Sequence, residues 1–235
     1  MSNDYPGGGL RCGIVHRLDK DTSGCLVIAK TPQAMARLSA AFAERKVRKI
    51  YKALVKGIPK QVTETIETNI GRSNGNRQKM AVLLERGGKE AITIYTLVQS
   101  GKIGKISTSL LNVKILTGRT HQIRVHLAYR NLPIIGDTVY GGNQAVPAPR
   151  QMLHAWKITL PHPRNGRKFT FEAPIPEDME ELLESMTDVV VPPVPPPPKK
   201  RRNDDDYDDY EDYEDVDMGD GGGEDDDAVD YSFLE

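Results

Sequence analysis

The sequence of 235 residues predicts an α+β domain built on a largely antiparallel sheet. Short segments rich in branched apolar residues recur along the chain with few helical segments between them, which favours a mixed, mainly antiparallel sheet with flanking helices. The composition then changes abruptly: residues 192–198 read PPVPPPP, and a KKRR cluster and a long acidic run follow. We therefore expect one folded domain followed by a disordered acidic tail.

Eight segments are predicted as strands because they are short and rich in branched apolar or aromatic residues. They are residues 13–18, 24–29, 49–55, 63–70, 91–99, 107–116, 152–160 and 168–172. Residues 32–45 are predicted as a helix, since Pro32 suits a first turn and apolar residues follow at helical spacing. Residues 176–186 are predicted as another helix, with acidic residues in its first turn.

Residues 120–129, with the sequence THQIRVHLAY, fit two patterns. Ile123 and Leu127 fit one face of a helix, but apolar and polar residues also alternate as they do in a strand. We favour a helix because Gly118 precedes the segment and Thr120 can cap it.

Three regions are expected along the chain: a folded domain at residues 1–188, a stiff proline-rich linker at 189–198, and a basic cluster with a disordered acidic tail at 199–235. Residues 1–198 hold 28 basic and 16 acidic residues, and residues 199–235 hold 4 and 17, so their net charges are +12 and −13. A body this basic suggests a polyanionic partner, although a soluble domain can also be basic without one. The opposite charges also suggest a contact between tail and body.

Several classes of protein are not expected. No stretch of 18 apolar residues is present, so we predict no membrane span, and the N-terminal MSNDYPGGGL does not resemble a secretory signal. Cys12 and Cys25 are too few for a disulfide framework or a zinc set, and we predict no metal site. We expect an intracellular protein of the cytoplasm or an organelle; PPPPKKRR resembles a nuclear-import signal, but four basic residues are a weak signal.

The segment GIVHRLDKDTSG, residues 13–24, has the most informative pattern. An apolar stretch runs into a short polar turn that can present Asp19 at the edge of a sheet, with Arg17 and Lys20 beside it. Adjacent cations favour the ionised, nucleophilic form of a carboxylate. The same residues also suit a surface turn with solvated charges, and Asp21 is a rival carboxylate whose simpler role is hydrogen bonding within the turn.

Two further segments combine cations with an aromatic ring or a helix start. In LTGRTHQIRVHL, residues 116–127, Arg119, His121 and Arg124 suit phosphate or carboxylate contacts. In RKIYKALV, residues 48–55, cations flank Tyr51, whose ring can stack on a base or simply pack against the core.

The segments HRLDKDTSG, YKALVKG and GRTHQIRVHL, in this order, resemble the signature motifs of the RluA-type pseudouridine synthases. Four more segments resemble the ribosomal-RNA branch of that family typified by RluD: GRSNGNRQKMAV, IIGDTVYGG, RQMLHAWKITLPHP and EAPIPEDMEELL. The resemblance covers residues 9–187. It implies a mainly antiparallel sheet with a central RNA-binding cleft, and conversion of uridine to pseudouridine in RNA, with ribosomal RNA as the expected substrate.

The resemblance also implies roles for particular residues. Asp19 corresponds to the catalytic aspartate, Tyr51 to the tyrosine that stacks on the target base, and Arg119 to the basic residue that pairs with the aspartate. No cofactor or metal is implied, because the reaction is an isomerisation. Contacts with RNA are expected from His16, Arg17, Lys20, Arg48, Lys52, Arg72, His121 and Arg124, although His16 and His121 could instead serve backbone groups.

Two departures from the family pattern leave a second function open. Only about 12 residues precede GIVHRLD, so we expect the usual N-terminal strand and the separate RNA-binding domain to be absent. The chain could then be a catalytically silent RNA-binding or ribosome-assembly protein rather than an enzyme. In either case we expect a monomer.

Overall fold

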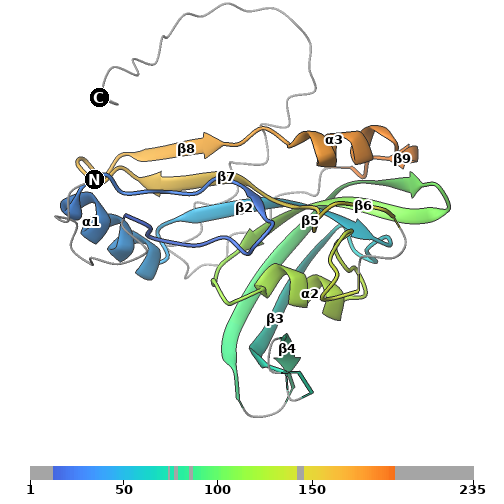
Figure 1. Ribbon diagram of the computed structural model, residues 1–235, viewed down its shortest axis with the longest axis horizontal. Helices are drawn as coiled ribbons and strands as arrows, with labels where there is room; N and C mark the ends of the chain where they lie inside the picture. The colour runs from blue at the N-terminus through green and yellow to red at the C-terminus, as the bar shows by residue number, and fades with distance from the viewer. Residues whose placement is uncertain (1–12, 74, 77–78, 85–86, 142–145, 194–235) are drawn as a thin grey trace, which may run out of the picture. The chain divides into compact units, whose positions relative to one another are not determined.

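The computed structural model describes residues 13–73, 75–76, 79–84, 87–141 and 146–193 (Figure 1). The chain divides into two compact units, Met1–Pro193 and Val194–Glu235, and every described residue belongs to the first. The predicted tail at 199–235 and the second half of the predicted linker lie outside the described residues.

One sheet of nine strands forms the centre of the described region. Its order is β1-β7-β2-β6-β5-β3-β4, while β8 also pairs with β7 and β9 with β5. All pairs are antiparallel except β1 with β7, so the predicted α+β fold with a mainly antiparallel sheet is confirmed. The elements are β1 Ser23–Gly24, α1 Pro32–Ala43, β2 Arg48–Lys56, β3 Thr63–Arg72, β4 Met80–Leu83, β5 Lys89–Ile103, β6 Ile106–Ile115, α2 Gln122–Tyr129, β7 Leu153–Pro161, β8 Lys168–Glu172, α3 Glu177–Glu184 and β9 Thr187–Val190.

Helices cover both faces of the sheet: α1 and α2 lie on one side, and α3 lies on the other (Figure 1). In the central strand β2, the consecutive residues Ala53, Leu54 and Val55 are all fully buried. Because side chains alternate between the faces of a strand, this run requires apolar cover on both sides. The main core accordingly contains Leu127 from α2 and Met179 from α3.

The helix predicted at residues 32–45 is confirmed and ends two residues earlier. Thr31 caps it, because its Oγ1 accepts a hydrogen bond of 3.1 Å from the amide of Ala34. Pro32 lies in the first turn, where its missing N–H costs nothing. Leu38 and Ala41 are the buried residues of α1 and pack against β7.

The segment at residues 120–129 is helical, as favoured, but its predicted cap is wrong. His121, not Thr120, occupies the N-cap, in a left-handed conformation with φ 56°. The preceding turn is instead held by Gln122, whose Oε1 accepts hydrogen bonds from the Thr117 hydroxyl (2.8 Å) and the Arg119 amide (2.9 Å). Gln122 thus fixes the turn that leads into α2, while His121 at the N-cap makes no side-chain capping hydrogen bond.

The two strands predicted at residues 13–18 and 24–29 are wrong. The two segments pair only through an isolated bridge between Ile14 and Ile28. The strand that forms here, β1, has two residues, Ser23 and Gly24, and pairs with β7. Between the two segments, the Val27 amide donates to Nε2 of His16 at 2.9 Å. A side chain therefore takes a backbone donor that a strand ladder would have used.

Two strands, β4 and β9, were not predicted, and β9 changes the boundary between the folded domain and the linker. β4 is short and lies at the edge of the sheet beside β3. β9 pairs with β5 through Ser100 with Val190 and Lys102 with Thr187. Since β9 reaches Val190, the described fold continues into residues that we assigned to the proline-rich linker.

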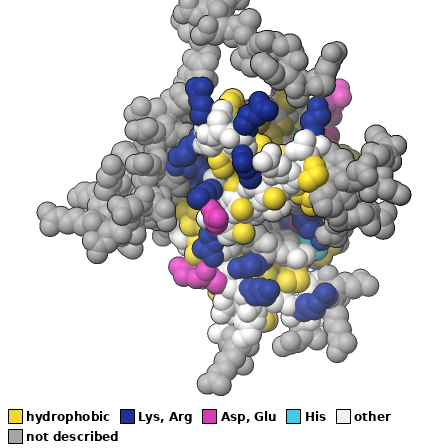
Figure 2. Space-filling model, turned by 90° about the vertical axis from the view of Figure 1, so that its left-hand side faces the viewer, with side chains coloured by type: hydrophobic (Ala, Val, Ile, Leu, Met, Phe, Trp, Pro, Cys, Tyr) yellow, Lys and Arg dark blue, Asp and Glu magenta, His cyan; other side chains and the backbone are white. Residues whose placement is uncertain are grey.

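Basic side chains are spread over the side of the molecule that carries α1 and the β7–β8 turn. Figure 2 shows many Lys and Arg side chains on this side of the molecule, among hydrophobic ones and few acidic ones. Arg37 of α1 donates to the carbonyl groups of Pro163 and Arg164, which fastens the helix to that turn. This surface is suited to a polyanion.

A buried histidine makes the stability of the fold depend on pH. His126 of α2 is fully buried, with Nε2 2.9 Å from the Thr68 hydroxyl, and its Nδ1 has no partner among the described residues. Burial, and secondarily the charge of Arg130, lowers its pKa from 6.5 to about 4. Between these two values the unfolded chain binds a proton that the folded chain does not, so acidification favours unfolding.

We therefore expect the melting temperature to fall as the pH drops from 6.5 towards 4. His126→Gln should flatten part of this decline, because glutamine does not titrate. Calorimetry of both proteins across this range tests the expectation, and parallel declines would contradict it.

Candidate active site

Asp19 opens a tight turn that two residues just before β7 hold in place. The Thr22 amide donates to the Asp19 carbonyl at 3.1 Å, which closes the turn. The buried Gln151 donates from Nε2 to the Lys20 carbonyl (2.8 Å) and to the Thr22 hydroxyl (3.0 Å). Arg150 reaches the Asp21 carbonyl at 3.3 Å. Arg150 and Gln151 thus hold the backbone of the turn that carries the Asp19 side chain.

The close approach of this turn to β7 depends on Gly24. Gly24 has φ +107°, and a Cβ at this position would collide with the backbone of Ala155. The Cys25 amide then donates to the Ala155 carbonyl at 2.9 Å. Glycine therefore allows the chain to lie against β7 immediately after the turn.

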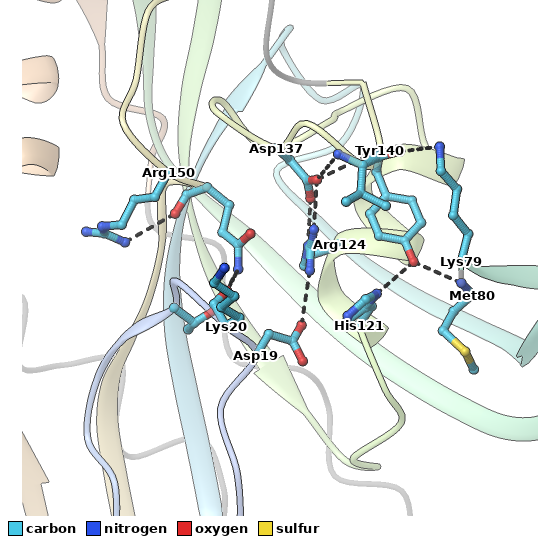
Figure 3. Close-up of polar contacts among 12 residues, drawn as sticks. Asp19, Lys20, Lys79, Met80, His121, Arg124, Asp137, Tyr140 and Arg150 are labelled. Carbon is cyan, nitrogen blue, oxygen red and sulfur yellow. Dashed lines mark hydrogen bonds and ion pairs between the residues drawn. The ribbon is translucent and has the colours of Figure 1, made fainter. Parts of the chain in front are cut away.

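A buried ion pair between Arg124 and Asp137 lies beside the turn (Figure 3). Arg124 donates from Nε and Nη2 to the two carboxylate oxygens of Asp137, at 2.8 and 2.9 Å. Asp137 also accepts from the amides of Val139 and Tyr140. Burial works against the charge of Asp137, but the hydrogen bonds and charge of Arg124 outweigh it and leave the Asp137 pKa below its usual value.

The remaining guanidinium nitrogen of Arg124 faces Asp19 (Figure 3). Nη1 lies 3.7 Å from Oδ2 of Asp19, and the side chains are 6% and 18% exposed. Because Asp137 fixes the plane of the guanidinium through two bonds, Arg124 can attract and orient the Asp19 carboxylate from a constant position.

The predicted pairing of Arg119 with Asp19 is wrong in this structure. Arg119 lies in the turn before α2, and its Nε donates to the Glu90 carbonyl of β5 at 2.8 Å. The guanidinium beside Asp19 belongs to Arg124, within the helix. Both arginines occur in the same motif, and its spacing alone did not distinguish them.

Tyr51 lies in β2 and is close enough to Asp19 to sense its charge. The residue is 8% exposed and belongs to the main core. Burial raises the pKa of Tyr51, and the negative charge of Asp19 raises it further. The hydroxyl is therefore a neutral phenol at physiological pH. Asp19, Arg124 and Tyr51 come from three separate segments and meet on the sheet face that α2 covers.

Tyr140 connects the buried ion pair to β4 (Figure 3). Its hydroxyl accepts from the Met80 amide at 3.0 Å and lies 2.9 Å from Nδ1 of His121. The Arg124 guanidinium lies over its ring, 5.1 Å from the centroid. Burial lowers the pKa of His121, although Asp19 acts in the opposite direction. His121 thus stabilises the fold through its contact with Tyr140, and it also lies close enough to Asp19 to sense its charge.

The remaining residues that were predicted to contact RNA do not lie in one place on the structure. Arg17 and Lys20 are exposed and flank Asp19, and Arg72 is exposed at the end of β3. Lys52 follows Tyr51 in β2, so it lies on the opposite face of the sheet.

His16 and Arg48 also lie away from these contacts with Asp19. His16 accepts from the Val27 amide and stacks on Phe42 at 4.8 Å, and burial lowers its pKa to about 4. This histidine serves the fold. Arg48 is partly buried at the start of β2.

Sequence reasoning missed three residues of the site. Asp137, Tyr140 and Gln151 all lie in segments that resemble the family, IIGDTVYGG and RQMLHAWKITLPHP, but no role was assigned to them. A lone Asp after two isoleucines and a glycine gives no local signal of a buried partner. Their roles become visible only in space, where Asp137 and Tyr140 meet Arg124 and Gln151 meets the turn after Asp19.

Two further findings concern metals and membranes. Among the described residues, no group of three or more His, Cys, Asp or Glu side chains could hold a metal ion. Within the same residues, none of the helices has the length and apolar character needed to cross a bilayer.

Arg124 should matter far more for stability than Arg119. Arg124→Met leaves Asp137 buried without its counter-charge, so we expect a loss of about 3–5 kcal/mol in the free energy of unfolding. Arg119→Met removes a hydrogen bond to one carbonyl and should cost about 1 kcal/mol.

Urea denaturation measures both losses. The double variant Arg124→Met/Asp137→Asn should recover part of the stability, because it removes the unpaired charge. Equal losses for the two single variants would contradict this account of the ion pair.

Comparison with known proteins found a matching family and several similar relatives. Residues 1–129 match the family described as RNA pseudouridylate synthase. An uncharacterized RNA pseudouridine synthase of Chlorobaculum parvum is 46% identical over 199 residues, covering 77% of this chain and 60% of the relative. The ribosomal large subunit pseudouridine synthase D of Zymomonas mobilis is 40% identical over 188 residues, covering 77% and 58%.

A solved structure is also similar in fold. The human RNA pseudouridylate synthase domain containing 1 protein superposes with a TM-score of 0.64 at 30% identity, covering 72% of each chain. The chain spans about three fifths of the length of the two curated relatives. The motifs, the mixed sheet and these matches agree, and the chain belongs to the RNA pseudouridylate synthase family.

Proposed function

We propose that this protein is an RNA pseudouridine synthase that isomerises uridine within RNA. The observation that carries the proposal is the Asp19 carboxylate on a fixed turn, 3.7 Å from an arginine that a buried aspartate holds in place. A carboxylate of this kind can act on the sugar carbon of a breaking glycosidic bond.

Asp19 is the proposed nucleophile. The N1–C1′ bond of uridine breaks while the carboxylate bonds to C1′, and the detached uracil turns until C5 faces the sugar. A C5–C1′ bond then forms as the carboxylate leaves; C5 loses a proton and N1 ends protonated. The atoms balance without an added reactant, so the proposal includes no cofactor.

Tyr51 and Arg124 are proposed to assist this step. The face of the Tyr51 ring would hold the detached uracil against the sheet, and the packing around Tyr51 keeps the ring in a fixed position. Arg124 acts through Asp19 as a positioning residue, since its other two bonds anchor it to Asp137. Arg119 has no part in this arrangement.

Ribosomal RNA is the proposed substrate, and its support comes from the relatives and from charge. The relative from Zymomonas mobilis is named for the large ribosomal subunit. A target uridine must leave its base stack to reach Asp19, which costs a few kcal/mol. Phosphate contacts from Arg17 and Lys20, and from the basic surface in Figure 2, can offset this cost. We propose that the protein acts as a monomer.

Replacing Asp19 tests the proposed reaction. Asp19→Asn keeps the size of the side chain but removes its charge, so we expect pseudouridine formation on ribosomal RNA transcripts to fall by at least about 10³-fold. Asp21→Asn, in the same turn, is the matched control and should retain most of the rate. Wild-type protein that binds RNA but forms no pseudouridine would instead support a silent RNA-binding protein.

We also propose that the acidic tail competes with RNA for the basic body. The support is the segregation of charge, −13 in residues 199–235 against +12 in residues 1–198. Deleting residues 199–235 should tighten RNA binding at low salt, where charges are least screened. A tail of equal length made of Gly and Ser should have the same effect. Unchanged affinity at low salt would contradict the proposal.

A further inference from the structure

A basic and aromatic cluster lies on the sheet face opposite to Tyr51. Lys52 follows Tyr51 in β2, and alternation along the strand puts its side chain on the other face. There its amino group lies over the ring of Trp156 in β7, 4.1 Å from the centroid. Lys157 approaches the same ring, 4.7 Å from its centroid. We call these three residues the Lys52–Trp156–Lys157 cluster.

Positive charge exceeds negative charge in this cluster. Lys157 forms an ion pair with Glu172 of β8 at 2.6 Å. Among the described residues, no carboxylate pairs with Lys52. Burial and then the charge of Lys157 lower the pKa of Lys52 to about 8, with Glu172 acting weakly against them. At pH 7 Lys52 is therefore still cationic but poorly compensated, and an anion placed beside it would be stabilised.

The cluster lies only a short way round the edge of the sheet from Asp19. In the sheet register, Lys52 pairs with His154, and His154 pairs with Ser23 of β1, which follows Asp19 by four residues. Two strand spacings separate Lys52 from Ser23, which is about 10 Å. In the path of strand pairing, β1 is the terminal strand next to β7. An RNA chain that extends from Asp19 to the cluster would pass this edge.

We propose that the Lys52–Trp156–Lys157 cluster is a second RNA contact, which binds a backbone phosphate of the single-stranded segment flanking the target uridine. Lysine pairs with phosphate as a point charge, and the Trp156 ring, which lies beneath both amino groups, holds the two cations close together. The inference depends on the proposed function for the choice of RNA as the polyanion. It extends the contact of the RNA from one face of the sheet to the other.

Trp156 reports on this contact directly, because it is the only tryptophan in the chain. Its emission is measured while the full-length protein is titrated with two dye-labelled RNAs, one a uridine-containing hairpin and the other the same hairpin with single-stranded flanks. Anisotropy of the dye follows binding in the same samples. The flanked RNA should change the emission at saturation, and the bare hairpin should not.

Two results of this titration would overturn the proposal. Saturation by the flanked RNA without a change in emission removes the contact. An equal change with the bare hairpin means that Trp156 senses events on the Asp19 face. Neither result depends on pseudouridine formation, so a failure of this inference is distinguishable from a failure of the proposed function, in which no pseudouridine forms.

A charge-matched pair of variants tests the role of Lys52. Lys52→Gln should weaken binding of the flanked RNA several-fold and reduce the slope of log affinity against log salt by about 0.7, the value for one phosphate on a single strand. Lys105→Gln, in the β5–β6 turn, removes the same charge seven positions from Asn112, the β6 partner of Lys52. It should leave both quantities unchanged. Equal effects of the two substitutions would contradict a specific contact at Lys52.

Discussion

The arrangement of the candidate site depends on one guanidinium group that serves two carboxylates. Arg124 gives two nitrogens to the fully buried Asp137 and turns the third towards Asp19. The first contact is structural, because neither charge could remain buried alone. The second is available for chemistry, because the Asp19 side chain retains some exposure. The buried pair therefore explains how a flexible side chain such as arginine can hold a fixed position.

The rest of the fold brings the two ends of this arrangement together. α2 carries Arg124, and the side chain of Gln122 fixes the turn from which the helix begins. Opposite Arg124, Gln151 holds the turn that presents Asp19. Arg150 links the same turn to α3 through two hydrogen bonds of 2.7 Å to Asp178. The turn is thus tied to elements on both faces of the sheet.

Local pattern predicted most of the fold and part of the site. Long strands rich in branched residues, such as β2 and β3, and the helix after Pro32 were predicted close to their observed bounds. The segments around His16 and Val27 were not, because a histidine nitrogen replaces the backbone partner that a strand would need. No propensity scale includes such a contact.

The motifs identified Asp19 and Tyr51 as candidates, but the choice between Arg119 and Arg124 required coordinates. Both arginines follow Gly118 within one motif, and what separates them is the direction in which each leaves its backbone. Arg119 donates a hydrogen bond to the Glu90 carbonyl, whereas Arg124 points from the helix to Asp137. Asp137 itself was invisible to local reasoning, since a buried partner 13 residues away leaves no periodic signal.

In the proposed reaction Asp19, oriented by Arg124, meets the sugar of the target uridine while Tyr51 faces its base. A crystal structure of Asp19→Asn with a bound uridine-containing RNA measures this directly. We expect an everted uridine with C1′ in contact with the residue 19 side chain, its base on the ring of Tyr51, and Arg124 still bonded to Asp137. A uridine bound away from residue 19, or an Arg124 turned away from it, would contradict the proposed roles of these residues.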